Sequence, residues 1–181
     1  SRERIIMHNI REEWSRITPD TTASQTPSYQ AAAEIIALNP EVLYIAPSYY
    51  EIEVTTKTNM QPLYSIRPCI SRKSEFIDPA LFSKLIDEAD SFAQAYSVCL
   101  GGGEPLLHPS IQSLITKTLS SAYLKTLIIE SDGLLMDDTF RSFLRHLDDA
   151  RIKVIIECCG YDRKSFSAIH QSDSFDQVEK N

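Results

Sequence analysis

From residue 47 onward, short apolar or β-branched segments alternate with amphipathic segments of helical period. The strand-like segments are residues 50–56, 96–100, 124–130 and 152–159, and the helix-like segments are residues 78–94, 109–121 and 137–150. Strands separated by helices of this length indicate βαβ units and a parallel sheet. Right-handed crossovers would curl such a series toward a barrel or an open doubly wound sheet.

The first helix of this series has a well-marked start. Asp78 is a favourable N-cap residue, and Pro79 suits the first helical position. Leu81, Leu85 and Ala89 then recur every four residues, so we expect this stripe to face the sheet.

The first 46 residues have a different pattern. Residues 3–17 place apolar side chains three or four apart, as in an amphipathic helix, and residues 30–39 predict a second short helix. Residues 18–28 between them are polar and contain two prolines, which is typical of a linker. We therefore predict a helical leader and linker over residues 1–46 and a (βα) domain over residues 47–181.

The composition excludes several classes of function. The chain of 181 residues has a net charge of −7, whereas a surface for nucleic acid or an anionic membrane needs a positive field. No uninterrupted apolar run approaches the length of about 18 residues needed to span a membrane. The charged N-terminal segment does not resemble a signal peptide. We expect a cytoplasmic protein without nucleic-acid or membrane partners.

Cysteine and histidine spacing gives no metal motif. The chain has the cysteines Cys69, Cys99, Cys158 and Cys159 and the histidines His8, His108, His146 and His170. No two cysteines form a Cys-x-x-Cys pair, and the adjacent two would face opposite ways on the fourth strand. We expect reduced thiols packed as small hydrophobic side chains, and no zinc site.

The segments that follow the strands are the place to look for function, because parallel α/β folds bind ligands at the carboxyl ends of their strands. The second segment, GGGEP, is the most informative. Its glycines let the backbone approach a ligand closely, and Glu104 offers an acceptor at the rim. A tight strand-to-helix turn is the simpler explanation. No Gly-Lys-Ser/Thr follows, so the segment is not a phosphate-binding loop.

Taken in order, these segments resemble the radical S-adenosylmethionine (radical SAM) family over most of residues 47–178. In that family the first strand leads into a Cys-x-x-x-Cys-x-x-Cys loop, the second ends in Gly-Gly-Glu-Pro, often before Leu-Leu-His-Pro, and the third ends near Thr-Asn-Gly. LGGGEPLLHP matches the second motif, and Ser131-Asp132-Gly133 is a conservative version of the third. IHQSDSFDQV, residues 169–178, resembles the stretch that leads into the family's fourth helix.

The resemblance implies an α/β fold, a partial (βα) barrel of radical SAM type that follows the helical leader. The length from residue 51 to the end suits about four parallel βα units, at roughly 30 residues a unit. We expect the strand order 1-2-3-4, an open edge at the fourth strand and a fourth helix cut short near Asn181. An open edge would favour self-association by strand pairing.

Laid on the family pattern, the three cluster-binding cysteines fall on Thr58, Pro62 and Ser65. A 4Fe–4S cluster needs thiolates, which hydroxyl groups do not readily replace and which proline lacks altogether. We therefore expect no cluster, no bound metal and none of the family's radical chemistry, in which the cluster binds and cleaves S-adenosylmethionine. The end of the fourth strand, Glu157 to Gly160, also departs from the family's small polar residue followed by Asp-Gly.

The resemblance also implies a cofactor-binding set. Gly102, Gly103 and Glu104 match the family's contacts to the methionine amino group of S-adenosylmethionine, and Tyr64 matches an aromatic near the adenine. Since the iron chelate would be missing, we expect S-adenosylmethionine to bind weakly or not at all. No catalytic residue is assigned.

Two classes of function stay open. The first is a non-catalytic pseudoenzyme that acts as a binding scaffold for a peptide or protein partner, resembling the SPASM-associated, spiro-SPASM-type branch. The second is an enzyme that uses S-adenosylmethionine in radical SAM-related or methyl-transfer chemistry at the glycine loop. A methyl-transfer site needs a base near the pocket, and Glu104 and Glu130 are the carboxylates at strand ends.

Overall fold

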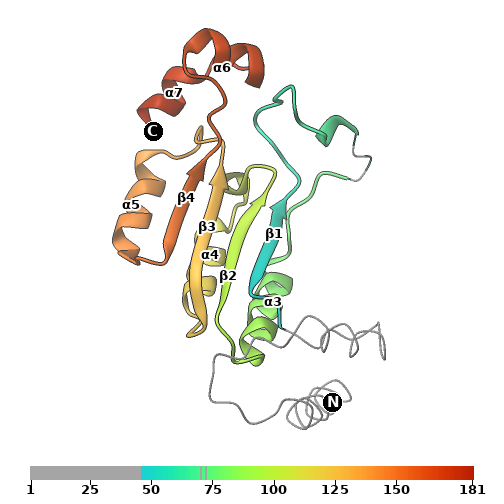
Figure 1. The fold of residues 1–181 in the computed structure, drawn as a ribbon, viewed down its shortest axis with the longest axis vertical. Helices are drawn as coiled ribbons and strands as arrows, with labels where there is room; N and C mark the ends of the chain where they lie inside the picture. The colour runs from blue at the N-terminus through green and yellow to red at the C-terminus, as the bar shows by residue number, and fades with distance from the viewer. Residues whose placement is uncertain (1–45, 70, 72) are drawn as a thin grey trace, which may run out of the picture. The chain divides into compact units, whose positions relative to one another are not determined.

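Four strands form one parallel sheet in the order β1-β2-β3-β4 (Figure 1). They are β1 Tyr49–Thr55, β2 Tyr96–Gly102, β3 Leu124–Ser131 and β4 Ile152–Ile156. The computed structural model describes residues 46–69, 71 and 73–181, so the predicted leader, apart from its last residue, lies outside the described residues. All three strand pairs are parallel. The predicted fold class, strand number and strand order are confirmed.

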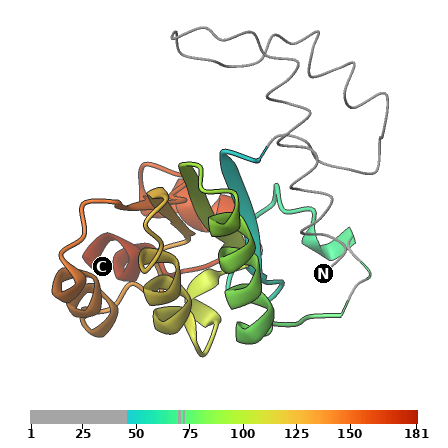
Figure 2. The same ribbon diagram turned by 90° about the horizontal axis from the view of Figure 1, so that it is seen from below.

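Three helices connect the strands and cover one face of the sheet: α3 Pro79–Ser91, α4 Ile111–Leu119 and α5 Asp138–Leu147. The helices α6 Arg163–His170 and α7 Phe175–Lys180 follow β4, and the short 3₁₀ turns are η1 Arg67–Cys69 and η2 Pro105–Leu107. Helices α3, α4 and α5 lie side by side on the same side of the sheet (Figure 2). Within the described residues, no helix combines the length and the apolar character that a membrane span requires.

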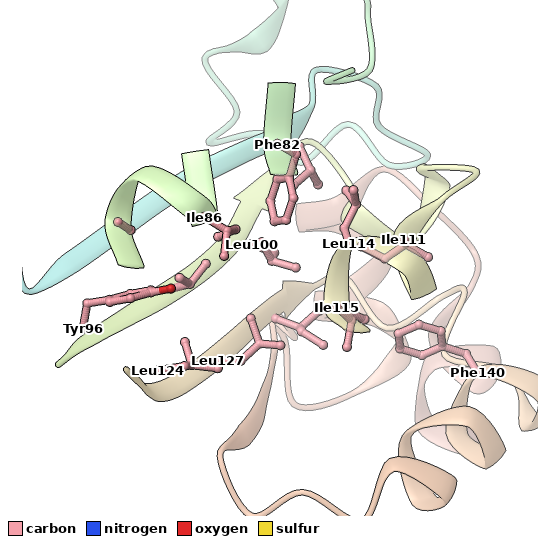
Figure 3. Packing of buried hydrophobic residues seen from close by; sticks show 14 of the residues in the cluster. Phe82, Ile86, Tyr96, Leu100, Ile111, Leu114, Ile115, Leu124, Leu127 and Phe140 are labelled. Carbon is pink, nitrogen blue, oxygen red and sulfur yellow. The ribbon is translucent and has the colours of Figure 1, made fainter. Parts of the chain in front are cut away.

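The hydrophobic core lies between this helical layer and the sheet. Alternate residues of β1, β2 and β3 enter the core, and in β2 they are Tyr96, Val98 and Leu100. Figure 3 shows side chains of α3 and α4 packed over these strands, among them Phe82, Ile86, Leu114 and Ile115. Because side chains alternate across a strand, the intervening residues face the other side of the sheet.

Helix α3 begins as predicted but turns a different stripe to the core. The Asp78 carboxylate accepts a hydrogen bond from the Ala80 amide at 2.8 Å. Leu81 and Leu85, however, are 51% and 39% exposed, whereas Phe82 and Ile86 are buried. The predicted stripe was therefore right for Ala89, which is buried, and wrong for Leu81 and Leu85. Phe82 and Ile86 have the same four-residue spacing one position further along, so spacing alone does not distinguish the two stripes.

The fourth strand is shorter than predicted. It ends at Ile156, since the Glu157 amide makes the last bond to β3, at Ser131 O (2.8 Å), and the chain then turns. Cys158 and Cys159 therefore lie beyond the strand and are exposed, as is Cys69; of the four thiols only Cys99 is buried. The expectation that all four pack as small hydrophobic side chains was wrong for three of them.

Beyond β4 the chain forms the two short helices α6 and α7, where we had expected the start of one. In the described part of the chain, β4 pairs with β3 alone. Its side chains Val154, Ile155 and Ile156 are 38%, 46% and 40% exposed. The expected open edge is therefore present within these residues.

Candidate functional site

A cavity of about 570 Å³ lies where the carboxyl ends of the strands converge. Its wall comes from the loop after β1, the end of β2, the end of β3 and residues after β4. The structure brings all the sequence-predicted site residues to this one cavity: Thr58, Pro62, Tyr64, Ser65, Gly102, Gly103 and Glu104.

The hydroxyl groups of the loop after β1 are engaged with the loop's own backbone. Thr58 Oγ1 donates to Met60 O at 2.6 Å and lies 3.3 Å from the Met60 amide nitrogen, which donates to it. Ser65 Oγ accepts from the Arg67 amide at 3.2 Å. With the side chain of Pro62 lacking a donor atom, this set of groups does not fit a 4Fe–4S cluster, which requires thiolates.

The described residues contain no group of three or more His, Cys, Asp or Glu side chains placed to hold a metal ion. The buried Cys99 lies on β2, while Cys158 and Cys159 follow β4.

Arg67 ties the loop to the first strand. Its guanidinium donates to Thr56 O at 3.1 Å and to the Glu53 carboxylate at 3.0 Å. A backbone bond from the Leu63 amide to Ile169 O, 2.8 Å long, joins the same loop to α6. Sequence reasoning missed Arg67; the available signal was an arginine two residues beyond the last position aligned with a cluster ligand.

The glycines allow β2 to run against the end of β1. Gly102 has φ +106°, and a Cβ atom there would lie 2.8 Å from Thr55 O. A Cβ on Gly103 would lie only 1.8 Å from Lys57 O. The Gly103 and Glu104 amides donate to Thr55 O and Lys57 O at 2.7 and 2.8 Å. The close approach that these glycines permit is thus to the chain's own backbone.

Glu104 is buried, with 1% of its surface exposed, so its predicted place at the rim was wrong. Oε1 accepts from the Leu106 amide at 2.9 Å and from Ser131 Oγ at 3.0 Å, and Oε2 accepts from the Asp132 amide at 2.8 Å. Burial, followed by the charge of Asp132, raises the pKa of this carboxyl to about 7, and the hydrogen bonds oppose the rise.

Tyr64 stands at the mouth of the cavity, where it is 48% exposed. Partial burial and a hydrogen bond with Cys159 raise the pKa of its hydroxyl. Its ring meets the His170 imidazole edge-on, with 6.2 Å between the ring centroids. The loop after β1 and the end of α6 therefore form one wall.

His170 is the buried member of this wall, with 1% of its surface exposed. Its ring stacks on Phe166 at 4.3 Å, and Nε2 accepts the Cys159 amide hydrogen at 3.1 Å. The proton of the neutral ring then belongs on Nδ1, which is buried and has no hydrogen-bond partner among the described residues. No motif marks His170, because its position depends on α6 packing against the loop.

No family model matches the chain. A GTP 3',8-cyclase of Chlorobaculum tepidum is 29% identical over 132 residues, which are 73% of this chain and 39% of that protein.

Solved structures share the fold at lower identity. BtrN in complex with AdoMet and 2-DOIA has a TM-score of 0.55 and 24% identity, covering 74% of this chain and 55% of BtrN. The enzyme anSMEcpe with bound AdoMet has a TM-score of 0.60 and 18% identity, over 73% of this chain and 38% of the other. SuiB of Streptococcus suis, bound to precursor peptide SuiA, has a TM-score of 0.63 and 15% identity. The match covers 98% of this chain and 41% of SuiB.

The chain spans about two fifths to just over half the length of these proteins. All of them are radical SAM enzymes. The motifs of the sequence resemble those of the radical SAM superfamily, and the solved structures share the fold of this chain, a partial (βα) barrel of four parallel βα units.

Proposed function

We propose that this domain is a non-catalytic, cluster-free relative of the radical SAM enzymes, a pseudoenzyme whose cavity serves as a binding site. The observation that carries the proposal is the composition of the cavity wall. Thr58, Pro62 and Ser65 lie there together, and none of them supplies a thiolate. A cytoplasmic location and a place in the spiro-SPASM-type branch are parts of the same proposal.

A peptide is the partner class with most support. SuiB and anSMEcpe were both solved with bound peptides, SuiA in the first and Kp18Cys in the second. At 15% and 18% identity, the likeness of this chain to SuiB and anSMEcpe shows a shared fold, and the bound peptides are properties of those two proteins. On this chain the carboxyl end of the sheet carries an open cavity of a size that suits a side chain and its neighbouring backbone.

Cluster reconstitution tests the proposal. Under anaerobic conditions with iron and sulfide, we expect the protein to retain iron well below the four atoms of one 4Fe–4S cluster per chain. The combined variant Thr58→Cys, Pro62→Cys and Ser65→Cys should load in part, since it restores three thiolates. Ser65→Cys alone is the matched control and should stay unloaded. Stoichiometric iron on the unmodified protein would refute the proposal.

Binding of S-adenosylmethionine gives a second, independent test. Gly102, Gly103, Glu104 and Tyr64 line the cavity, so residual recognition is allowed. If the missing chelate contributes about 3 kcal/mol, its absence weakens binding roughly 100-fold. We expect weak or undetectable heat in isothermal titration, and no deoxyadenosine after addition of a strong reductant.

A methyl-transfer enzyme is the second candidate, and one observation favours it. Glu104 is a buried carboxyl in the cavity wall with its pKa raised to about 7, the range of a general base that works near neutral pH. Isothermal titration with S-adenosylmethionine and with S-adenosylhomocysteine separates the candidates. Micromolar or tighter binding of both would favour the enzyme over the scaffold.

A further inference from the structure

The face of the sheet opposite the helices is acidic. Glu51 and Glu53 of β1 and Glu130 of β3 belong to the residues that alternate with the core positions, and all line the cavity. Glu53 pairs in register with Gly101. A Cβ on Gly101 would lie 3.3 Å from Glu130 Oε2, so the carboxylate of Glu130 lies over this glycine. The absence of a side chain at Gly101 makes room for it.

Acidic side chains outnumber basic ones around this cavity. Among the described residues, the carboxylates in its wall are Glu51, Glu53, Glu104, Glu130, Asp132 and Glu157, and the one permanently cationic side chain there is Arg67. Arg67 is bonded to Glu53, and Glu104 is bonded to β3 and its own turn. Within the described residues no salt bridge joins Glu51, Glu130 or Glu157 to a basic side chain.

A cation is the ligand group that this wall favours. Carboxylates that share a cleft repel one another, and their combined field attracts a positive group and concentrates it there. A lysine ammonium or an arginine guanidinium would form charge-assisted hydrogen bonds with them. Lys153 lies on the same face, at the edge strand, and is not part of the cavity wall.

His170 supplies the independent observation. Its side chain is almost fully buried in the wall of the same cavity, and its Nδ1 has no hydrogen-bond partner in the part of the chain that the structure describes. A buried donor without an acceptor is costly, and native proteins rarely keep one without a reason. A ligand with a hydrogen-bond acceptor would satisfy it. A peptide provides such an acceptor in every backbone carbonyl.

We infer that the cavity binds a basic peptide, with a lysine or arginine side chain among Glu51, Glu130 and Glu157 and a peptide carbonyl that accepts from His170 Nδ1. This inference rests on the proposed function and specifies the chemistry of its partner. The peptide side chain supplies the positive charge that the carboxylates attract, and the peptide backbone supplies the carbonyl that accepts the hydrogen bond from His170.

Selection from a displayed library of short random peptides tests it on the intact chain. We expect peptides enriched in Lys and Arg at one position. The variant Glu51→Gln, Glu130→Gln, Glu157→Gln should lose the enrichment. Three exposed acids outside the cavity provide a control of equal charge change, Glu75→Gln, Glu88→Gln, Glu179→Gln, and this control should retain it.

Titration of one selected peptide then measures the contribution of the charge. Replacing its lysine with norleucine, or its arginine with citrulline, should weaken binding at least tenfold in isothermal titration. The nitrogen and hydrogen signals of His170 Nδ1 should shift in NMR spectra when the peptide is added. The cavity variant should show neither the tenfold difference nor the affinity of the unmodified chain.

The outcomes separate the inference from the proposal beneath it. Enrichment of peptides without an excess of Lys and Arg would overturn the inference and leave a peptide-binding scaffold. Equal loss of binding in the cavity variant and the control would also overturn it, as it would show non-specific attraction to an acidic protein. If no peptide is enriched over the empty support, the scaffold proposal itself fails.

Discussion

Ser131 donates its hydroxyl hydrogen to Oε1 of Glu104 across 3.0 Å, at the point where β2 and β3 end side by side. The Ser131 oxygen in turn accepts the Gly133 amide hydrogen at 3.0 Å, and Oε2 of Glu104 accepts that of Asp132 at 2.8 Å. The glycine-rich motif after β2 and the Ser-Asp-Gly motif after β3 are therefore one hydrogen-bonded unit.

The pKa of Glu104 predicts a pH dependence of stability. Because this pKa rises from 4.5 to about 7 on folding, the folded chain holds the proton more tightly, and stability should fall as pH rises between these values. The full effect corresponds to about 3 kcal/mol. Urea denaturation at both ends of this range should show the fall in the unmodified protein and its absence in Glu104→Gln. An identical pH dependence in the two proteins would contradict the assignment.

Two glycines of the same motif, Gly101 and Gly103, should differ sharply in their tolerance of alanine. Gly103→Ala would place Cβ against the Lys57 carbonyl, which belongs to backbone and cannot turn aside, so we expect a loss of about 3 kcal/mol or more in unfolding free energy. Gly101→Ala is the matched control, since its Cβ would meet only the flexible end of Glu130. Chemical denaturation of both variants measures the contrast, and similar losses would contradict this account.

Loss of the Arg67 hydrogen bonds should increase the local opening of the loop after β1 while changing the global unfolding free energy little. Arg67→Met removes the bonds to Thr56 O and Glu53 while keeping the aliphatic stem. A partly exposed ion pair contributes about 1 kcal/mol or less, so the unfolding free energy should change little. Hydrogen exchange of the amides between Met60 and Arg67 should speed up markedly. Unchanged exchange in this segment would show that other contacts hold the loop.

The exposed edge of β4 should promote self-association. Ile155 is 46% exposed, and a lysine there would place a charge on an edge strand, a feature that opposes strand pairing between molecules. We expect the unmodified chain to associate with rising concentration in sedimentation experiments and Ile155→Lys to do so less. Leu81→Lys, on the exposed face of α3, is the control. A chain that remains monomeric throughout would exclude edge pairing.

The local pattern of the sequence predicted the elements of the fold, and the family resemblance predicted the partial barrel. Alternating strand-like and helix-like segments predicted the four parallel strands, and Asp78 and Pro79 predicted the start of α3. Which face of α3 packs on the sheet could not be derived, because Leu81 and Leu85 have the same spacing as Phe82 and Ile86. Packing against the sheet decides which of the two pairs is buried. The end of β4 could not be derived either, since β4 ends where β3, at Ser131, provides its last backbone hydrogen bond.

For the site, the motifs identified the cavity but not its chemistry. Tyr64 and the glycine motif are in its wall, as the strand-end rule predicted. The burial of Glu104 was missed because it results from a bond to β3, twenty-seven positions away in the sequence. The positions of His170 and Arg67 likewise arise from contacts between distant segments, which no local spacing encodes.

The bond between Glu104 and Ser131 has an evolutionary consequence. Since both oxygens of Glu104 are already used inside the protein, a lineage that ceased to use a cofactor would still be selected to retain this glutamate and its glycines. Survival of the Gly-Gly-Glu-Pro signature in a descendant is then evidence of shared ancestry and of a working fold, and it says little about whether the ancestral reaction continues.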